Sequence, residues 1–166
     1  IKRLHRQIMT SAVWMQSSSV TDVHRSNDPD NRLLSRMPMR RLSAEEVRDT
    51  MLLVADRLNE TPFGDPDAVE VREDGLVTSK PVDGKWRRSI YVRQRRKEMP
   101  TIFEAFDLPQ MTPNCTERTA STVVTQSLHL LNNRMVFDLA QAFATRVQSE
   151  AGDDETGQVT RAFEIA

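Results

Sequence analysis

Between residues 107 and 132 the sequence gathers side chains that could hold a small ligand or act on it. They are a carboxylate, a thiol, a guanidinium, two hydroxyls and two amides, contributed by Asp107, Cys115, Arg118, Ser121, Thr122, Gln126 and Asn132. We expect Asp107 and Arg118 to form a charge-assisted pair, and Ser121 or Thr122 to cap the helix that follows. Gln126 lies one turn further on, where it can tie the loop to that helix. Such a cluster serves a structural lock and a small-ligand site equally well, so both interpretations stand.

Thiol and imidazole groups offer a second kind of chemistry. Cys115 with His129 could be a nucleophile and its base. A lone cysteine more often packs as a small apolar side chain, and we favour that role. One cysteine makes neither an internal disulfide nor a Cys-x-x-Cys site for metal or haem. The histidines at 5, 24 and 129 lack ligand spacing, so we expect no metal site and no cofactor in these residues.

A basic stretch with interleaved aromatic residues runs from residue 85 to residue 97. Besides Lys85, Trp86 and Tyr91, it contains Arg87, Arg88, Arg93, Arg95, Arg96 and Lys97. Cations that bind phosphate and rings that stack on bases are typical of nucleic-acid-binding strands. The alternative is that these arginines pair with the acidic residues 42–84 or with a neighbouring domain. We favour the alternative, because the isoelectric point is near 6.4 and no nucleic-acid-binding motif accompanies the stretch.

The net charge is −1, but the charged residues fall into four segments whose net charge alternates in sign. Residues 1–41 carry +5, residues 42–84 carry −7, residues 85–118 carry +4 and residues 119–166 carry −3. Such blocks indicate internal pairing or docking of adjacent domains more than one polyanionic partner. At 166 residues the chain fits one domain with a single core. No window approaches the roughly 18 consecutive apolar residues that a membrane-spanning helix needs.

Helical signals dominate residues 1–60. Apolar residues recur at helical spacing from Leu4 to Met15, which predicts a first helix over that range. A short second helix is predicted to start at Pro29 with Asp28 as its cap, since the alternative of a calcium loop there lacks the required glycine. The clearest helix follows Ser43, which begins a capping box. Its predicted apolar stripe consists of Val47, Met51, Val54, Ala55 and Leu58.

The pattern changes over residues 65–118. Residues 69–72 and 76–78 flank Asp74-Gly75 and have the character of short strands, which predicts a β-hairpin. Residues 89–93 could add a third strand. Residues 103–115 are predicted to form an ordered loop held by Pro109 and Pro113.

Helical signals return over residues 119–166. A helix over 124–131 should break at Asn132-Asn133, after which a second stripe contains Val136, Ala140, Phe143 and Val147. Residues 153–155 form the acidic first turn of a last helix. We therefore predict a mainly α fold with a small antiparallel hairpin or three-stranded element. The chain reads as one domain fragment, residues 1–166, with both ends cut through helices.

Several of these motifs together resemble a domain of unknown function from planctomycete-type multidomain proteins. The resemblance rests on the 107–132 cluster and on the segments 14–18, 28–34, 41–49 and 87–91, and it touches nearly all of the chain except about residues 59–84. Trp14 replaces a tyrosine that is common in the family, and Val124-Thr125 replaces a small residue followed by proline.

The resemblance implies a function by association alone. The domain sits near the C-terminal end of proteins that often carry a cytochrome c-like segment upstream, which implies an extracytoplasmic, haem-linked protein acting on complex polysaccharides. Its partners would be adjacent domains, some of them haem-bearing, and a glycan. The resemblance supplies no catalytic residues, so whether the domain is an enzyme stays open. A non-enzymatic scaffold and a nucleic-acid binder through residues 85–97 are the alternatives, and we expect the last to be the weakest.

Overall fold

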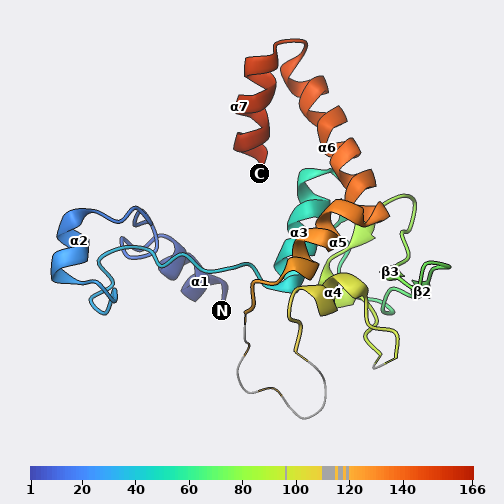
Figure 1. Cartoon of the computed structure of the whole chain (residues 1–166), viewed down its shortest axis with the longest axis horizontal. Coiled ribbons are helices and arrows are strands. Elements are labelled where there is room, and N and C mark those ends of the chain that lie inside the picture. The colour runs from blue at the N-terminus through green and yellow to red at the C-terminus, as the bar shows by residue number, and fades with distance from the viewer. Residues whose placement is uncertain (96, 110–114, 116–117, 119) are drawn as a thin grey trace. The chain divides into compact units, whose positions relative to one another are not determined.

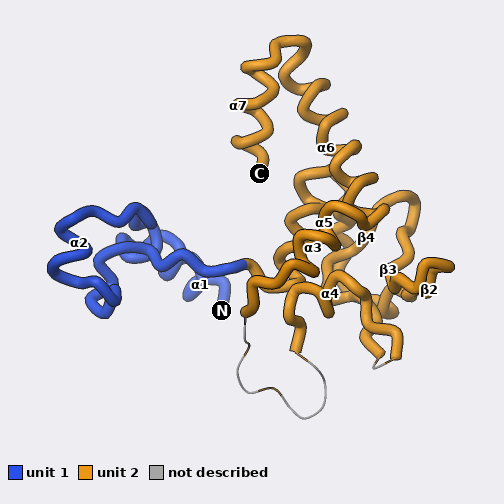
Figure 2. The backbone as a smooth tube through the Cα atoms, viewed as in Figure 1, with its two compact units in different colours: residues 1–41 blue, residues 42–166 orange. Residues whose placement is uncertain are grey.

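Helices make up most of the regular structure, as the apolar spacing predicts (Figure 1). The computed structural model describes residues 1–95, 97–109, 115, 118 and 120–166. Within these ranges lie seven α-helices, one 3-10 helix and four short strands, so the mainly α class with a small antiparallel β element is confirmed. The chain divides into two units, residues 1–41 and residues 42–166, which Figure 2 colours separately.

The first unit contains two short helices, and both depart from the predicted bounds. Helix α1 spans Lys2–Met9 and ends earlier than predicted. The hydroxyls of Thr10 and Ser11 donate to the Arg6 and Ile8 carbonyls at 2.8 and 2.7 Å, which satisfies the last turn from the side chains. Helix α2 spans Asp22–Asn27 and begins at a capping box of Thr21 and His24, ahead of the predicted start.

Asp28 does not cap the N-terminus of a helix, so the prediction of a helix that starts at Pro29 is wrong. Its carboxylate follows α2 and accepts hydrogen bonds from the backbone N–H groups of Arg32 at 2.7 Å and Leu33 at 3.1 Å. The Ser35 hydroxyl adds a third bond at 3.0 Å. These donors hold residues 28–36 as a closed loop, because each provides the buried carboxylate with a partner inside the same segment.

The second unit begins with helix α3, Ala44–Val54, and here the predicted capping box is confirmed. The Ser43 backbone N–H donates to Glu46 at 2.7 Å, and the Glu46 N–H donates to the Ser43 hydroxyl at 3.4 Å. The buried face, however, is not centred on the predicted stripe: it consists of Ala44, Arg48 and Leu52. An arginine therefore occupies the middle of the interior face, with polar partners described below.

The predicted hairpin is confirmed, but the predicted third strand is not. Strands β2, Val69–Val71, and β3, Val77–Ser79, pair antiparallel around Gly75, whose φ of 81° suits the turn. Residues Ser89–Tyr91 form the 3-10 helix η1 instead of a strand. The reason is a long-range contact: the Ser89 backbone N–H and hydroxyl both donate to Asp49 of α3, which turns the chain. A separate parallel pair joins β1, Leu58–Asn59, to β4, Trp86–Arg87.

Four helices complete the second unit (Figure 1). Helix α4, Thr101–Ala105, takes up the start of the ordered loop that was predicted over residues 103–115, since Ile102 and Phe103 are buried in the core. Residues 110–114 of that predicted loop lie outside the described part of the chain. The predicted break separates α5, Val124–Asn132, from α6, Arg134–Ala151. Helix α7, Glu155–Ile165, starts as predicted in an acidic turn, with Asp154 as its cap.

Two apolar clusters hold α3 against its neighbours. The first contains Ala44, Val92, Ile102 and Phe103, and the second contains Leu52, Ala55 and Leu139. Met51 packs against both, so α3 joins the α4 side to the α6 side. Arg146 of α6 also donates to the carbonyls of Leu53 and Val54 at 3.3 and 2.9 Å. This cation stabilises the C-terminal end of α3, where the helix dipole is negative.

Candidate functional site

The predicted polar cluster does not form one site; part of it is a lock between two helices. Asp107 follows α4 and accepts hydrogen bonds from the Ser121 backbone N–H at 2.6 Å and the Ser121 hydroxyl at 2.8 Å. The buried Gln126 amide of α5 donates to Asp107 at 3.4 Å and to the Ser121 carbonyl at 3.3 Å. Gln126 thus ties the loop to the helix as predicted. Ser121 does not cap α5, however, because its hydroxyl is used by Asp107 and the cap position is Val123.

Arg118 binds a different carboxylate, and no ion pair with Asp107 is found among the described residues, contrary to the prediction. Both terminal nitrogens of Arg118 bind the Glu45 carboxylate of α3, each at 2.9 Å. This bidentate bond lowers the pKa of Glu45 below its ordinary value, although partial burial opposes the shift. The guanidinium side chain remains 55% exposed. The pair therefore fixes Arg118 against α3 at the surface of the unit.

The remaining members of the cluster lie in other surroundings. Cys115 is exposed, so the favoured prediction that it packs as a small apolar side chain is wrong. Thr122 is exposed as well. Asn132 lines a hollow between α4 and α5, together with His129. Five of the seven residues predicted from sequence therefore separate into a lock, a surface ion pair and part of a pocket, while Cys115 and Thr122 are exposed outside these groups.

The basic stretch is largely used inside the second unit. Arg87 donates to Asp67 at 2.6 Å, binds the carbonyls of Phe63 and Asp65, and lies over the Tyr91 ring at 4.8 Å. Arg88 pairs with Asp49 at 3.5 Å. The preferred interpretation, that these arginines pair with the acidic residues 42–84, is confirmed for both.

The end of the stretch is placed differently. Arg95 pairs with Glu98 at 3.6 Å, Arg93 is half-buried and Lys97 is exposed, while Arg96 lies outside the described residues. The aromatic residues serve the fold too, since the Trp86 indole N–H donates to the Ser79 carbonyl at 2.9 Å.

Arg48 is the central polar residue that the sequence analysis did not single out. Only 1% of it is exposed. It donates to the hydroxyls of Ser79 and Ser89 at 2.8 and 3.2 Å and to the Arg87 carbonyl at 3.1 Å. Asp49 supplies the opposite charge at 3.4 Å. Burial lowers the pKa of Arg48, and the nearby carboxylates oppose this shift. The network joins α3 to β3 and to the β4–η1 segment.

A groove with a volume of about 880 Å³ runs beside the exposed face of α3. Its charged lining includes the Glu45–Arg118 and Asp49–Arg88 pairs, and Glu46 and Glu60 add further carboxylates. The hydroxyls of Ser43, Thr50 and Ser89 and the amide of Gln94 supply neutral polar groups, while Leu42, Leu53, Leu58 and Ile90 supply apolar ones. Ile90 is 80% exposed and Leu53 is 56% exposed. The groove thus combines open apolar side chains with two salt bridges and with the carboxylate of Glu60.

The described residues contain neither a cluster of metal ligands nor a membrane-spanning helix. No cluster of three or more His, Cys, Asp or Glu side chains able to hold a metal ion occurs there. In the described residues, no helix has the length and apolar character needed to cross a membrane.

Comparison with known proteins places the chain in one family. No curated protein and no solved structure matches it. One family model, PSD1, described as "Protein of unknown function (DUF1553)", matches residues 1–166. Because the match extends over the whole sequence, this chain belongs to the PSD1 (DUF1553) family of proteins of unknown function.

Proposed function

We propose that this chain is an interaction module that docks a protein segment in the groove beside α3. The observation that carries the proposal is the exposed apolar pair at the groove, Ile90 and Leu53, which are 80% and 56% exposed. Salt-bridged side chains flank them. Protein interfaces commonly have an apolar centre surrounded by a polar rim. The groove has that composition.

The internal hydrogen bonds of the polar cluster support docking over catalysis. Asp107, Ser121 and Gln126 bond to one another and hold the α4–α5 connection, and Arg118 is bound to Glu45. Groups committed to internal hydrogen bonds in this way are less available to attack or protonate a substrate. These internal bonds hold the surface of the unit in one conformation, so fewer groups must be ordered when a partner binds.

The charges of the groove indicate the chemistry of its partner. Its lining contains the four carboxylates named above and two guanidinium groups, so it carries a net negative charge. A matching segment presents aliphatic side chains to Ile90 and Leu53 and a Lys or Arg to Glu60. We propose that an adjacent domain of the same exported protein supplies this segment. Haem-bearing domains are included, as the family resemblance implies.

Site-specific photocrosslinking in the full-length protein tests this proposal. A photoreactive residue replaces Ile90 in one sample and Val71, which is 61% exposed on the hairpin, in a matched control. We expect crosslinks from position 90 to one defined segment, and their loss when Leu53 is changed to Lys. Equal crosslinking from positions 71 and 90, or none from position 90, would overturn the docking proposal.

Polysaccharide processing outside the cytoplasm is the second candidate. Glycosidases use two carboxyl groups, and the groove places Glu45 and Asp49 one turn apart on α3. The lowered pKa of Glu45 keeps this carboxyl ionised, as a nucleophile must be, but Arg118 would have to release it before it could react. Release of reducing sugars from a panel of polysaccharides, with Glu45→Gln as the control, tests this candidate. Activity equal in the wild type and in this variant would exclude Glu45 from any such role.

Nucleic-acid binding through residues 85–97 has less support. Arg87 is held by Asp67 and its side chain is 12% exposed, so it offers little to a phosphate.

A further inference from the structure

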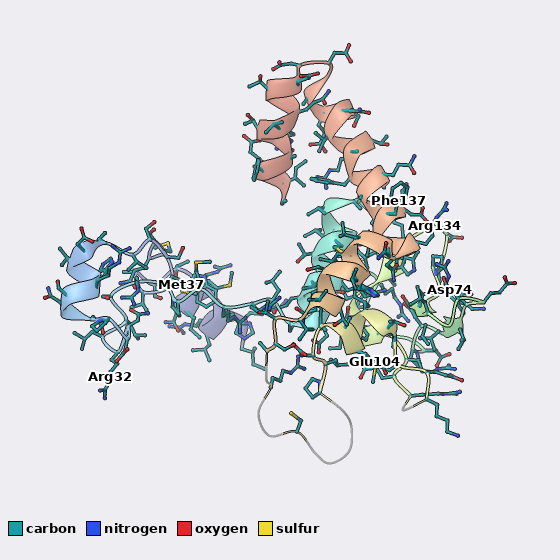
Figure 3. All side chains as sticks on the ribbon, viewed as in Figure 1. Arg32, Met37, Asp74, Glu104, Arg134 and Phe137 are labelled. Carbon is teal, nitrogen blue, oxygen red and sulfur yellow. The ribbon has the colours of Figure 1, made fainter. Side chains whose placement is uncertain are left out.

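The hollow between α4 and α5 is separate from the α3 groove and has its own chemistry. Its volume is about 490 Å³, within the range of small-molecule sites. Apolar side chains of Leu76, Ala105 and Leu128 form part of its wall, and Glu104, His129 and Asn132 supply polar groups. Figure 3 labels Glu104 on α4, and the other two polar residues belong to the neighbouring α5.

Hydrogen bonds fix the protonation state of the imidazole. The Asn133 side-chain oxygen caps α6 by accepting the N–H groups of Met135 at 2.8 Å and Val136 at 3.4 Å. The amide nitrogen of Asn133 therefore faces His129 Nε2, at 3.2 Å, as a donor. Nε2 must then hold a lone pair, so the hydrogen of the neutral ring is on Nδ1. Burial lowers the pKa of His129 and favours the same neutral form.

The polar groups of the hollow are open to a ligand. Within the described part of the chain, the Glu104 carboxylate, the Asn132 amide and His129 Nδ1 form no hydrogen bond or ion pair with protein groups. Glu104 and Asn132 are also exposed. Among the described residues, no Lys or Arg lines the hollow. With a neutral imidazole, Glu104 is the charge that a ligand meets, so the hollow is selective for a cation over an anion.

We propose that the hollow between α4 and α5 binds a small organic amine with an apolar body. The ammonium group binds the Glu104 carboxylate and the Asn132 side-chain carbonyl, while the apolar body lies against Leu76 and Leu128. The neutral His129 ring borders the ligand without repelling its charge. Its Nδ1–H can donate to an acceptor on the ligand or to a water molecule. This site is independent of the docking groove, because the two hollows share no lining residue.

An NMR titration of the 166-residue chain tests the proposal. Phenylethylamine is the probe, and phenylpropanoate, with a similar body and the opposite charge, is its control. We expect saturable shifts at the His129 ring and at the amides of α5 with the amine at millimolar concentration, and none with the carboxylate. Absence of saturable shifts with the amine, or equal shifts with both compounds, would overturn the proposal.

Two charge-neutralising variants then locate the binding group. Glu104→Gln removes the carboxylate of the hollow, whereas Glu73→Gln makes the same change at an exposed position on the β-hairpin turn. We expect Glu104→Gln to weaken amine binding about two- to fivefold, as loss of one partly solvated ion pair predicts, and Glu73→Gln to leave it unchanged. Equal affinity of the two variants would refute the assignment of Glu104. Both positions are exposed, so both variants should fold, which circular dichroism checks.

Discussion

Replacing Arg48 with Met should destabilise the second unit more than any comparable change at a surface arginine. Arg48 is buried and bonds to Ser79, Ser89 and the Arg87 carbonyl, and it faces Asp49. Met fills much of the same space without a charge or a donor. The change therefore removes the polar interactions while keeping much of the apolar contact of the side chain.

The loss of stability in Arg48→Met depends on which groups bonded to Arg48 keep other hydrogen-bond partners. Removing one member of a buried ion pair typically costs about 3–5 kcal/mol. Asp49 is 17% exposed and keeps bonds from the Ser89 N–H and hydroxyl, so its own loss is moderate. The Ser79 hydroxyl and the Arg87 carbonyl lose a donor in the interior, at about 1–3 kcal/mol for each stranded group. We expect a loss of about 3 kcal/mol in the free energy of unfolding for Arg48→Met. Arg48→Lys should lose about 1–2 kcal/mol, because an ammonium keeps the charge but spans fewer acceptors.

Urea unfolding followed by far-ultraviolet circular dichroism measures this loss. Arg134→Met is the matched control, since Arg134, labelled in Figure 3, forms an exposed i,i+4 pair with Asp138 at 2.9 Å. That control should cost no more than about 0.5 kcal/mol. If Arg48→Met and Arg134→Met shift the midpoint equally, with unchanged slopes, the buried network does not contribute to stability as argued.

Three further predictions test the helix cap, the surface pair and the buried histidine. Ser43→Ala should cost about 0.5–2 kcal/mol in urea unfolding, because the Glu46 N–H loses its acceptor. A double-mutant cycle on Glu45 and Arg118 should give a coupling of at most about 1 kcal/mol, since the guanidinium is half exposed, whereas Asp107→Ala and Arg118→Gln should be additive. Burial lowers the pKa of His129, so the unfolded chain binds a proton more readily than the folded one. Stability should be level above about pH 6.5 and fall on acidification below it, and thermal unfolding of His129→Gln should show a smaller fall.

Local signals allowed several elements to be predicted from the sequence. The Ser43 capping box, the hairpin around Gly75 and the break before α6 all depend on residues a few positions apart. Their hydrogen bonds form within the segment itself, so the segment specifies them whatever surrounds it. The prediction failed where two nearby residues could each have started the second helix. Thr21 with His24 started α2 ahead of Asp28, whose carboxylate then bound the loop after the helix.

Long-range partners could not be predicted in this way. Asp107 and Arg118 were expected to pair because they are close in sequence, yet Arg118 binds Glu45, 73 positions away. Asp107 instead holds Ser121. Arg48 was missed because an arginine in an apolar stripe is normally read as part of the exposed face. One signal was present: Arg48 stands four residues after Ala44 and four before Leu52, in line with the buried face.

The charge blocks of the sequence help to explain which groups of this chain are available to bind a partner or ligand. Arg87, Arg88 and Arg118 come from the basic block, and each is bonded to a carboxylate of the acidic block. Much of that opposite charge therefore stabilises the fold and leaves less of it for an outside partner. The described groups that stay uncommitted include the apolar side chain of Ile90 at the groove and the open carboxylate of Glu104. Because these two sites share no lining residue, a change at Ile90 should affect docking and leave amine binding intact, and Glu104→Gln should do the reverse. A variant that impaired both would indicate that the two hollows are coupled through α3 and α4, which pack against each other.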